Sequence, residues 1–375
     1  MTSIHEITER RAPVKADVVY FKNLNGLRAI AALLVVFQHV DLIKKKLGLP
    51  VQTKSSIFNF PIGSLSVTFF FVLSGFLITF LLLKEEHQNH TIQVKKFYVR
   101  RILKIWPLYF LLTLIGFTYL FYSKGFDGII PSLLCYAFIL PNFATTSNPL
   151  CFQSWSIGVE EQFYLIWPLI VSKKNILVLS LTIIILFFIL RTIPEVYHIC
   201  KINCPSILIK IKDFVVENRF DSMAIGGILA YLQFNKLIKY RFSAVQKYFF
   251  YGVLVLFFLI SNKLYFGTQH FIFSILFAIF IYFQIIDERG NIFLESKVMK
   301  YLGKISYGIY MWHVVAIFLS LGLCKYLMTD INYLSPGFNL VLYTLSVVFT
   351  IVISIISFEF YESYFLKFKR KFYKV

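Results

Sequence analysis

The sequence has few acidic residues, few charged residues of either sign, and few cysteines. Asp and Glu number 19 against 38 Lys and Arg, and charged residues make up 15% of the chain. Five cysteines are present, and their spacing matches no metal site, so we expect no metal. Cys200 and Cys204 could form a disulfide in a loop. No linker rich in Pro, Gly or Ser occurs, so we expect a single domain with no soluble domain fused to it.

Apolar residues are abundant. Hydrophobic residues make up 58% of the chain and the mean hydropathy is +0.71, whereas soluble domains are about 45–50% apolar. Apolar runs of about 20 residues recur along nearly the whole sequence, which predicts an all-α polytopic membrane protein. The net charge of +19 could indicate nucleic acid binding. In a polytopic protein it is better explained by basic cytoplasmic loops, so we expect membrane lipids and no nucleic acid as partners.

Ten apolar segments are each long enough to be considered a membrane span. They are residues 24–43, 65–83, 105–122, 155–171, 176–192, 219–234, 248–261, 270–286, 304–322 and 338–360. A further apolar segment, 129–140, is short, and it could be re-entrant, interfacial or an eleventh span.

The distribution of Lys and Arg predicts the orientation. With the N-terminus inside, 26 of the 38 basic residues fall on the cytoplasmic side, which favours two cytoplasmic termini. We therefore expect a cytoplasmic segment 1–23, a transmembrane domain 24–362 and a basic cytoplasmic tail 363–375. Three lysines at 44–46 go against this trend.

The first span carries Arg28 near its start and His39 near its end. Eleven residues return to nearly the same helix face and separate the two by roughly 16 Å. Ionisable groups inside a membrane are costly and often functional. His39 is suited to act as a general base. The alternative is an arginine that reaches the interface and a histidine that bonds a neighbouring helix. Asp41 points to another face, so it is a poor partner for His39.

A basic loop follows the second span and contains Arg100, Arg101 and Lys104. Such residues could hold the phosphates of a nucleotide-bearing cofactor. They could equally contact lipid phosphates, or simply follow the positive-inside rule.

Glu160 and Glu161 lie near the start of the fourth span, beside Trp155. They could cap a helix N-terminus, and the aromatic residues could form an interfacial belt. Alternatively, a glutamate could orient His39, since the predicted topology gives the two a similar depth.

Two later stretches carry further polar candidates. Arg219 and Asp221 precede a small-residue helix whose glycines would allow close packing. Tyr310 and His313 share a helix face, where a structural role is the simpler interpretation.

Taken together, the sequence resembles the acyltransferase-3 family of polytopic membrane acyltransferases over nearly its whole length. The stretches that carry the resemblance are LNGLRAIAALLVVFQHV, FFFVLSGFLIT, YVRRILKIWPLYF, SWSIGVEEQFYLIWP, RFDSMAIGGILAYL and ISYGIYMWHV. Some family members carry a fused esterase-like domain, and we expect this chain to be a stand-alone membrane domain. The family's Arg-x10-His motif falls on Arg28 and His39, and its glutamate motif on Glu160 and Glu161. Its paired basic motif falls on Arg101 and Lys104.

Lys104 departs from that motif, since many members have Arg there, and Lys loses bidentate phosphate recognition. The resemblance implies an integral protein of the bacterial inner membrane. It implies transfer of an acyl group, usually acetyl, from cytoplasmic acyl-CoA to a hydroxyl of a surface polysaccharide or glycolipid. Acetyl-CoA would then be a donor substrate, and no cofactor would be tightly bound. We expect Arg28, Arg100, Arg101 and Lys104 to bind the donor.

His39 would be the base, oriented by Glu160 or Glu161. Trp155, Arg219, Asp221 and His313 are candidates for contacting the acceptor. Asn25 and Tyr310 are candidates both for that contact and for donating to the oxyanion.

A transporter or flippase of anionic lipids or sugars is the alternative. No convincing pair of broken helices in matching halves supports it. A soluble-type acetyltransferase is disfavoured because no Gly-rich pyrophosphate loop or hexapeptide repeat occurs.

Overall fold

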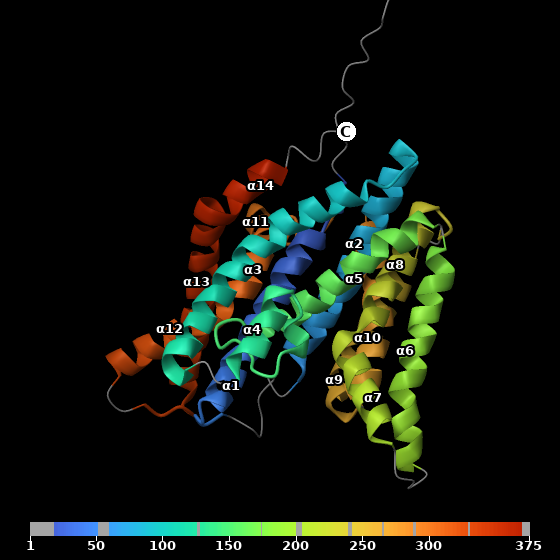
Figure 1. Ribbon diagram of the computed structural model, residues 1–375. Helices are drawn as coiled ribbons and strands as arrows, with labels where there is room; N and C mark the ends of the chain where they lie inside the picture. The colour runs from blue at the N-terminus through green and yellow to red at the C-terminus, as the bar shows by residue number, and fades with distance from the viewer. Residues whose placement is uncertain are drawn as a thin grey trace, which may run out of the picture.

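A computed structural model describes residues 19–51, 60–125, 128–173, 175–199, 205–238, 242–264, 266–287, 290–328 and 331–369. Within these ranges the chain is helical and contains no strand (Figure 1). The helices are α1 Leu24–Lys46, α2 Ile62–Asn89, α3 Val94–Lys124, α4 Ile129–Ala137, α5 Trp155–Ser172, α6 Ile176–Ile199, α7 Ser206–Asn218, α8 Phe220–Phe234, α9 Ala244–Ile260, α10 Phe266–Ile285, α11 Lys297–Lys304, α12 Ser306–Leu327, α13 Pro336–Ser357 and α14 Ser363–Lys369. The predicted all-α polytopic fold is confirmed.

Eight helices of the described part are long and apolar enough to cross a membrane: α1, α2, α3, α6, α9, α10, α12 and α13 with its continuation into α14. The other two predicted spans are also helices, α5 and α8. The 18 residues of α5 are long enough but, with Glu160 and Glu161 among them, not apolar enough, whereas α8 is too short. The 15 residues of α8 extend only about 22 Å, less than the roughly 30 Å of a bilayer core. The expectation of ten full spans is therefore reduced to eight, with α5 and α8 packed among them.

Residues 138–154, here called the inserted segment, connect α4 to α5. The nine residues of α4 extend only about 13 Å, so residues 129–140 do not form an eleventh span. Inside the inserted segment, the buried Asn148 donates from its side chain to Thr113 O at 3.1 Å and from its main chain to the Tyr136 hydroxyl at 3.0 Å. Irregular backbone is tolerated within a membrane protein when its polar groups are satisfied in this way.

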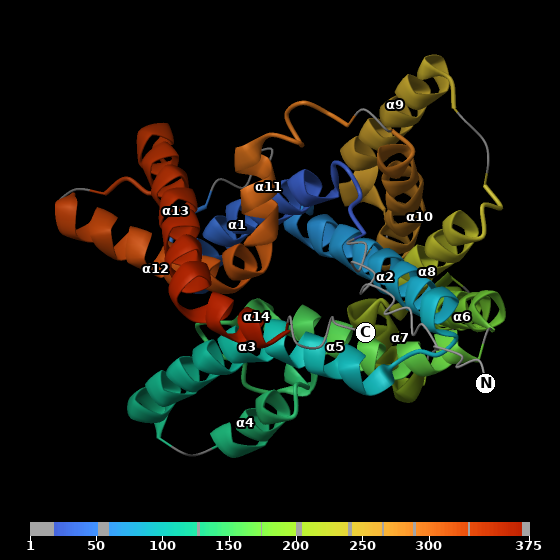
Figure 2. The same ribbon diagram turned by 90° about the horizontal axis from the view of Figure 1, so that it is seen from above.

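Helices α2 and α8 approach until their backbones touch. A methyl group on Gly75 would clash with the backbone oxygen of Met223, and one on Gly226 with that of Val72. The small-residue face predicted on the sixth span is thus used for packing. Next to α10 at the edge of the bundle, α9 has no buried residue, which suits a helix that faces lipid (Figure 2).

Helices α7 and α8 meet at a break rather than forming one helix. Arg219 lies between them with φ 45°, in the left-handed region that side chains other than glycine rarely adopt. The break directs the Arg219 side chain toward α2, as described below.

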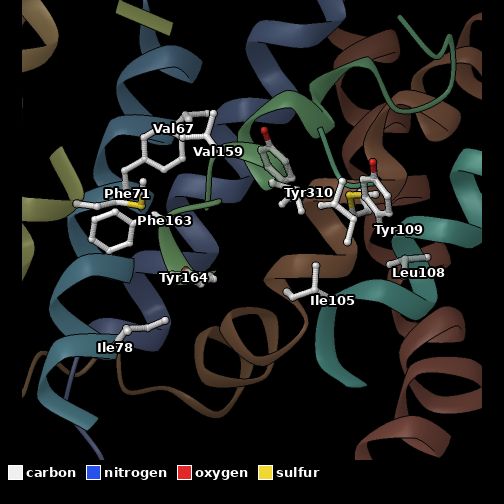
Figure 3. Close-up of a cluster of buried hydrophobic side chains, with 14 of the residues drawn as sticks. Val67, Phe71, Ile78, Ile105, Leu108, Tyr109, Val159, Phe163, Tyr164 and Tyr310 are labelled. Atoms are coloured by element: carbon white, nitrogen blue, oxygen red, sulfur yellow. The ribbon is translucent and has the colours of Figure 1, made fainter. Parts of the chain in front are cut away.

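Apolar side chains from α2, α3, α5 and α12 form the largest part of the core around the polar residues. Figure 3 shows Val67 and Phe71 of α2 near Phe163 of α5, with Tyr109 of α3 and Tyr310 of α12 further along the same cluster. This core brings together motifs from four separate parts of the sequence.

The beginning of α1 and the last helix, α14, lie toward the same end of the bundle (Figure 1). Residues 1–18 and 370–375 are outside the described residues, as are Cys200 and Cys204. The described part of the predicted basic tail is α14, which packs against α3, and just before it the Tyr361 hydroxyl donates to Pro107 O at 3.1 Å. The sidedness of the two ends stays a prediction.

Candidate active site

His39 and His313 form a pair between α1 and α12. The distance from His39 Nδ1 to His313 Nε2 is 2.5 Å, and the two rings stack with centres 4.8 Å apart. His39 is half-buried, whereas His313 is fully buried behind it. The prediction that Glu160 or Glu161 is the partner of His39 is therefore wrong, because His313 occupies that place.

Three contacts to main-chain carbonyls of α12 hold the pair in position. His313 Nδ1 lies 2.7 Å from Tyr310 O, one helical turn earlier. The Gln153 amide, at the end of the inserted segment, donates to Tyr310 O at 3.2 Å and to Met311 O at 3.0 Å. Sequence reasoning missed Gln153, whose only signal was a polar residue just before the glutamate motif.

These contacts determine which nitrogen atoms carry protons in the neutral pair. A carbonyl only accepts, so His313 Nδ1 must carry its proton toward Tyr310 O. His313 Nε2 is then an acceptor, and His39 Nδ1 must donate to it. His39 Nε2 is left with a lone pair, which is the form that a general base requires.

The second polar group combines Arg28 of α1, Arg101 of α3 and Glu160 of α5. Arg28 interacts electrostatically with both Glu160 and Arg101. The Arg101 guanidinium lies 4.7 Å from the centre of the Tyr164 ring. Within the described ranges, the half-buried Arg28 side chain makes no hydrogen bond. We call Arg28, Arg101, Glu160 and Glu161 the arginine–glutamate cluster.

Both glutamates are fixed by hydrogen bonds. Glu160 accepts from Ser74 Oγ at 2.8 Å and from the Tyr164 hydroxyl at 3.1 Å. Glu161 accepts from Trp106 Nε1 at 3.3 Å. Neither glutamate lies in the first turn of α5, so the helix-capping alternative is wrong.

The remaining basic candidates differ from Arg101. Arg100 forms an ion pair with Glu85 at 3.0 Å, so part of its charge is already used within the protein. Lys104 interacts electrostatically with Glu362, which the sequence analysis did not identify. Glu362 ends a π-helical turn, Phe358–Glu362, a type of turn that is common at functional sites.

Arg219, Trp155 and Asp221 lie in the region where α5 meets α8. The Arg219 guanidinium lies 5.4 Å from the Trp155 ring centre, and it donates to Ser64 O at 3.1 Å and to Thr68 Oγ1 at 3.2 Å. Asp221 is buried and pairs with Arg191 at 2.8 Å. Asp221 is therefore not placed to contact an acceptor, and its role is to stabilise the packing of α6 on α8.

Neither oxyanion candidate is well placed. Asn25 precedes His39 by 14 residues, about 21 Å along α1, and its backbone packs against Gly303 instead. The Tyr310 hydroxyl donates to Gln153 O at 3.0 Å and also contacts Ser156 Oγ at 2.6 Å. Its proton is thus engaged inside the protein.

Comparison with known proteins decides the family. The model of a family described as an acyltransferase domain, acyltransferase-3, matches residues 21–359. The chain belongs to the acyltransferase-3 family. It is accordingly an integral membrane protein of an acyltransferase family, and the matched region includes every candidate residue that the sequence predicted, but not Glu362.

Several curated relatives are similar to the chain over most of its length. A Staphylococcus aureus (strain COL) protein named "Putative O-acetyltransferase" is 26% identical over 93% of this chain. The O-acetyltransferase OatA of S. aureus (strain NCTC 8325) is 24% identical over 92% of it. The chain spans 58% and 57% of the length of these two relatives. No solved structure matches the chain.

Proposed function

We propose that this protein transfers an acyl group, most simply acetyl, from acyl-CoA to a hydroxyl of a surface glycan or glycolipid. The observation that carries the proposal is the pairing of His39 with His313, which leaves a lone pair on the half-buried His39 Nε2. The O-acetyltransferase names of the relatives support the reaction class.

The reaction follows from this arrangement. His39 Nε2 takes the proton of the acceptor hydroxyl while its oxygen attacks the thioester carbonyl. The tetrahedral intermediate then collapses, the carbon–sulfur bond breaks, and the proton on His39 passes to the leaving thiolate. His313 supports the imidazolium through its Nε2 acceptor, as an oriented partner does in other acyl-transfer sites.

The arginine–glutamate cluster is the donor site in this proposal. Arg28 and Arg101 would bind CoA phosphates, and the roughly 16 Å from Arg28 to His39 along α1 would be spanned by the pantetheine arm. Glu160, held by Ser74 and Tyr164, positions the two arginines before the donor arrives. This replaces the earlier expectation that a glutamate orients the base.

We further propose that the protein lies in the bacterial inner membrane with both termini in the cytoplasm. The Arg28 end of α1 would then face the cytoplasmic pool of acyl-CoA, and the His39 end would face the acceptor. The excess of basic residues in the predicted cytoplasmic loops supports this orientation.

The test uses the full-length protein in lipid nanodiscs with radiolabelled acetyl-CoA. We expect His39→Ala to abolish both thioester hydrolysis and labelling of membrane glycans. His90→Ala, which alters an exposed histidine between α2 and α3, is the control and should remain active. Full activity in His39→Ala would contradict the mechanism, and transport of an anionic sugar without thioester cleavage would favour a transporter.

A further inference from the structure

Three lysines, Lys44 to Lys46, end α1 beyond His39. They are the residues that oppose the positive-inside trend in the sequence. Lys44 is buried, and its ammonium donates to Tyr333 O at 3.0 Å and to Asn339 Oδ1 at 2.8 Å. Lys44 therefore ties the end of α1 to α13 and has a structural role, but Lys45 and Lys46 are exposed.

Lys46 is connected to the base through a single aromatic ring. Its ammonium lies 3.5 Å from the centre of the Phe152 ring, and the Phe152 and His39 ring centres are 5.3 Å apart in an edge-on contact. Because both distances meet at the Phe152 ring, the ammonium lies at most about 9 Å from the centre of the imidazole, within the roughly 10 Å screening length of 0.1 M salt.

Among the residues that the structure describes, none supplies a counter-charge for this ammonium. Within the described ranges, no carboxylate forms an ion pair with Lys46. The nearest acidic residue along α1, Asp41, instead interacts with Lys44 and Tyr343. A cation held on an aromatic ring beside the base is thus available to an anion from outside the protein.

The order of residues along α1 indicates which of the two substrates would carry the anion that binds Lys46. Arg28, His39 and Lys46 follow one another, with Lys46 about 10 Å beyond His39. The donor phosphates are assigned to Arg28 and Arg101 at the opposite end. A molecule that reaches His39 from the Lys46 side would be the acceptor.

We infer that the acceptor carries a negative charge, a phosphate or a carboxylate, close to the hydroxyl that is acylated, and that Lys46 binds this charge. The inference rests on the function proposed above and specifies its acceptor class. A glycosyl phosphate attached to a lipid and an anionic polysaccharide share this chemistry. Phe152 would hold the lysine side chain in place, which reduces the entropy lost on binding.

The test uses the full-length protein in nanodiscs, radiolabelled acetyl-CoA, and an envelope fraction from the source organism with this gene deleted. Labelled glycans are cleaved by glycosidases at neutral pH and separated by anion exchange. We expect the label to elute with anionic fragments. Extraction into organic solvent distinguishes a lipid-linked acceptor from a polymer. Label on neutral fragments alone would overturn the inference.

Variants then connect the charge to Lys46. Lys46→Glu should lower acetyl transfer at limiting envelope concentration at least about 10-fold, the effect of removing and reversing one close ionic contact. Lys46→Arg should restore most of it. Lys325→Glu, which changes another exposed lysine at the end of α12, is the matched control. The KM for acetyl-CoA should be unchanged in all three.

Failure of this inference is distinguishable from failure of the proposed function. If transfer depends on His39 but is unaffected in Lys46→Glu, the acceptor inference alone is wrong. If Lys46→Glu raises the KM for acetyl-CoA instead, the lysine belongs to the donor site and the inference is also wrong. If the wild-type protein transfers no label, or His39→Ala transfers as much, the proposed function itself is wrong.

Discussion

The two polar regions along α1, the arginine–glutamate cluster and the histidine pair, differ in their electrostatic surroundings. In the arginine–glutamate cluster, positive and negative side chains from three helices lie together and are only half-buried. Around His39 the neighbours are the His313 imidazole, which contacts the Tyr310 carbonyl, and the Phe152 ring, with the Lys46 ammonium on that ring. Charge suits the first region because a multiply charged ligand is held there. Oriented hydrogen bonds suit the second because a base needs its lone pair in a fixed direction.

This difference predicts that substitutions in the two regions affect different kinetic parameters. Losses at the histidine pair should appear mainly in kcat, since they affect the transition state. Losses in the arginine–glutamate cluster should appear mainly in the KM for the donor.

The largest effect is expected for His39→Ala. Removing a general base lowers the rate by about 10²- to 10⁴-fold, so kcat for acetyl transfer should fall by that factor while the KM for acetyl-CoA is retained. Single-turnover measurements with radiolabelled acetyl-CoA separate the two parameters. A loss confined to KM would show that His39 binds substrate and is not the base.

His313→Phe should have the next largest effect. It removes the acceptor of the His39 Nδ1 proton and frees the base to rotate, for which we expect a fall in kcat of about 10²-fold. His313→Asn should keep more activity, because its amide oxygen can still accept that proton. Equal activity of the two variants would indicate that His313 acts only through packing. The pH profile of kcat should change in His313→Phe more than in His313→Asn.

Arg101→Ala tests the arginine–glutamate cluster. A hydrogen bond to a charged group contributes about 1.5–3 kcal/mol, equivalent to a rise in the KM for acetyl-CoA of about 10- to 100-fold. Arg100→Ala is the matched control, because Arg100 is already paired with Glu85. Equal rises in KM for the two variants would show that the basic residues of this stretch attract the donor through their summed charge and not through a specific contact of Arg101.

The smallest effect is expected for Trp106→Phe. The substitution keeps an aromatic ring but removes the indole N–H that donates to Glu161. This hydrogen bond is long, at 3.3 Å, so we expect it to contribute only about 0.5–1.5 kcal/mol and the KM for acetyl-CoA to rise about 2- to 10-fold. A large fall in kcat instead would place Glu161 in the chemical step.

Much of the fold could be predicted from the sequence, because apolar runs of membrane length are a strong signal. All ten predicted spans are helices in the structure. The signal fails for α8, which is apolar but too short to span, and for α5, which is long enough but less apolar because of Glu160 and Glu161. Hydropathy cannot report that the inserted segment enters the bundle, since its buried polar groups are satisfied only by distant residues such as Thr113.

The same insertion explains the error about His39. Counting residues from the membrane surface gave Glu160 and His39 a similar depth, on the assumption that α5 starts at that surface. In the structure, the residue that reaches the α12 carbonyls next to the histidine pair is Gln153, and Glu160 lies beside Arg28. The shared helix face of Tyr310 and His313 was visible in the sequence, but not that it faces α1.

The backbone contact between α2 and α8 has a consequence for how substrates enter and leave. Two helices that touch through glycines cannot slide or part without losing that contact, so the pair serves as a rigid frame. Ser74 and Thr68 on α2 attach both Glu160 and Arg219 to this frame. We therefore expect α2 and α8 to stay fixed during turnover. The movement that admits the acceptor would then belong to α1, α12 and the inserted segment, which meet at the histidine pair.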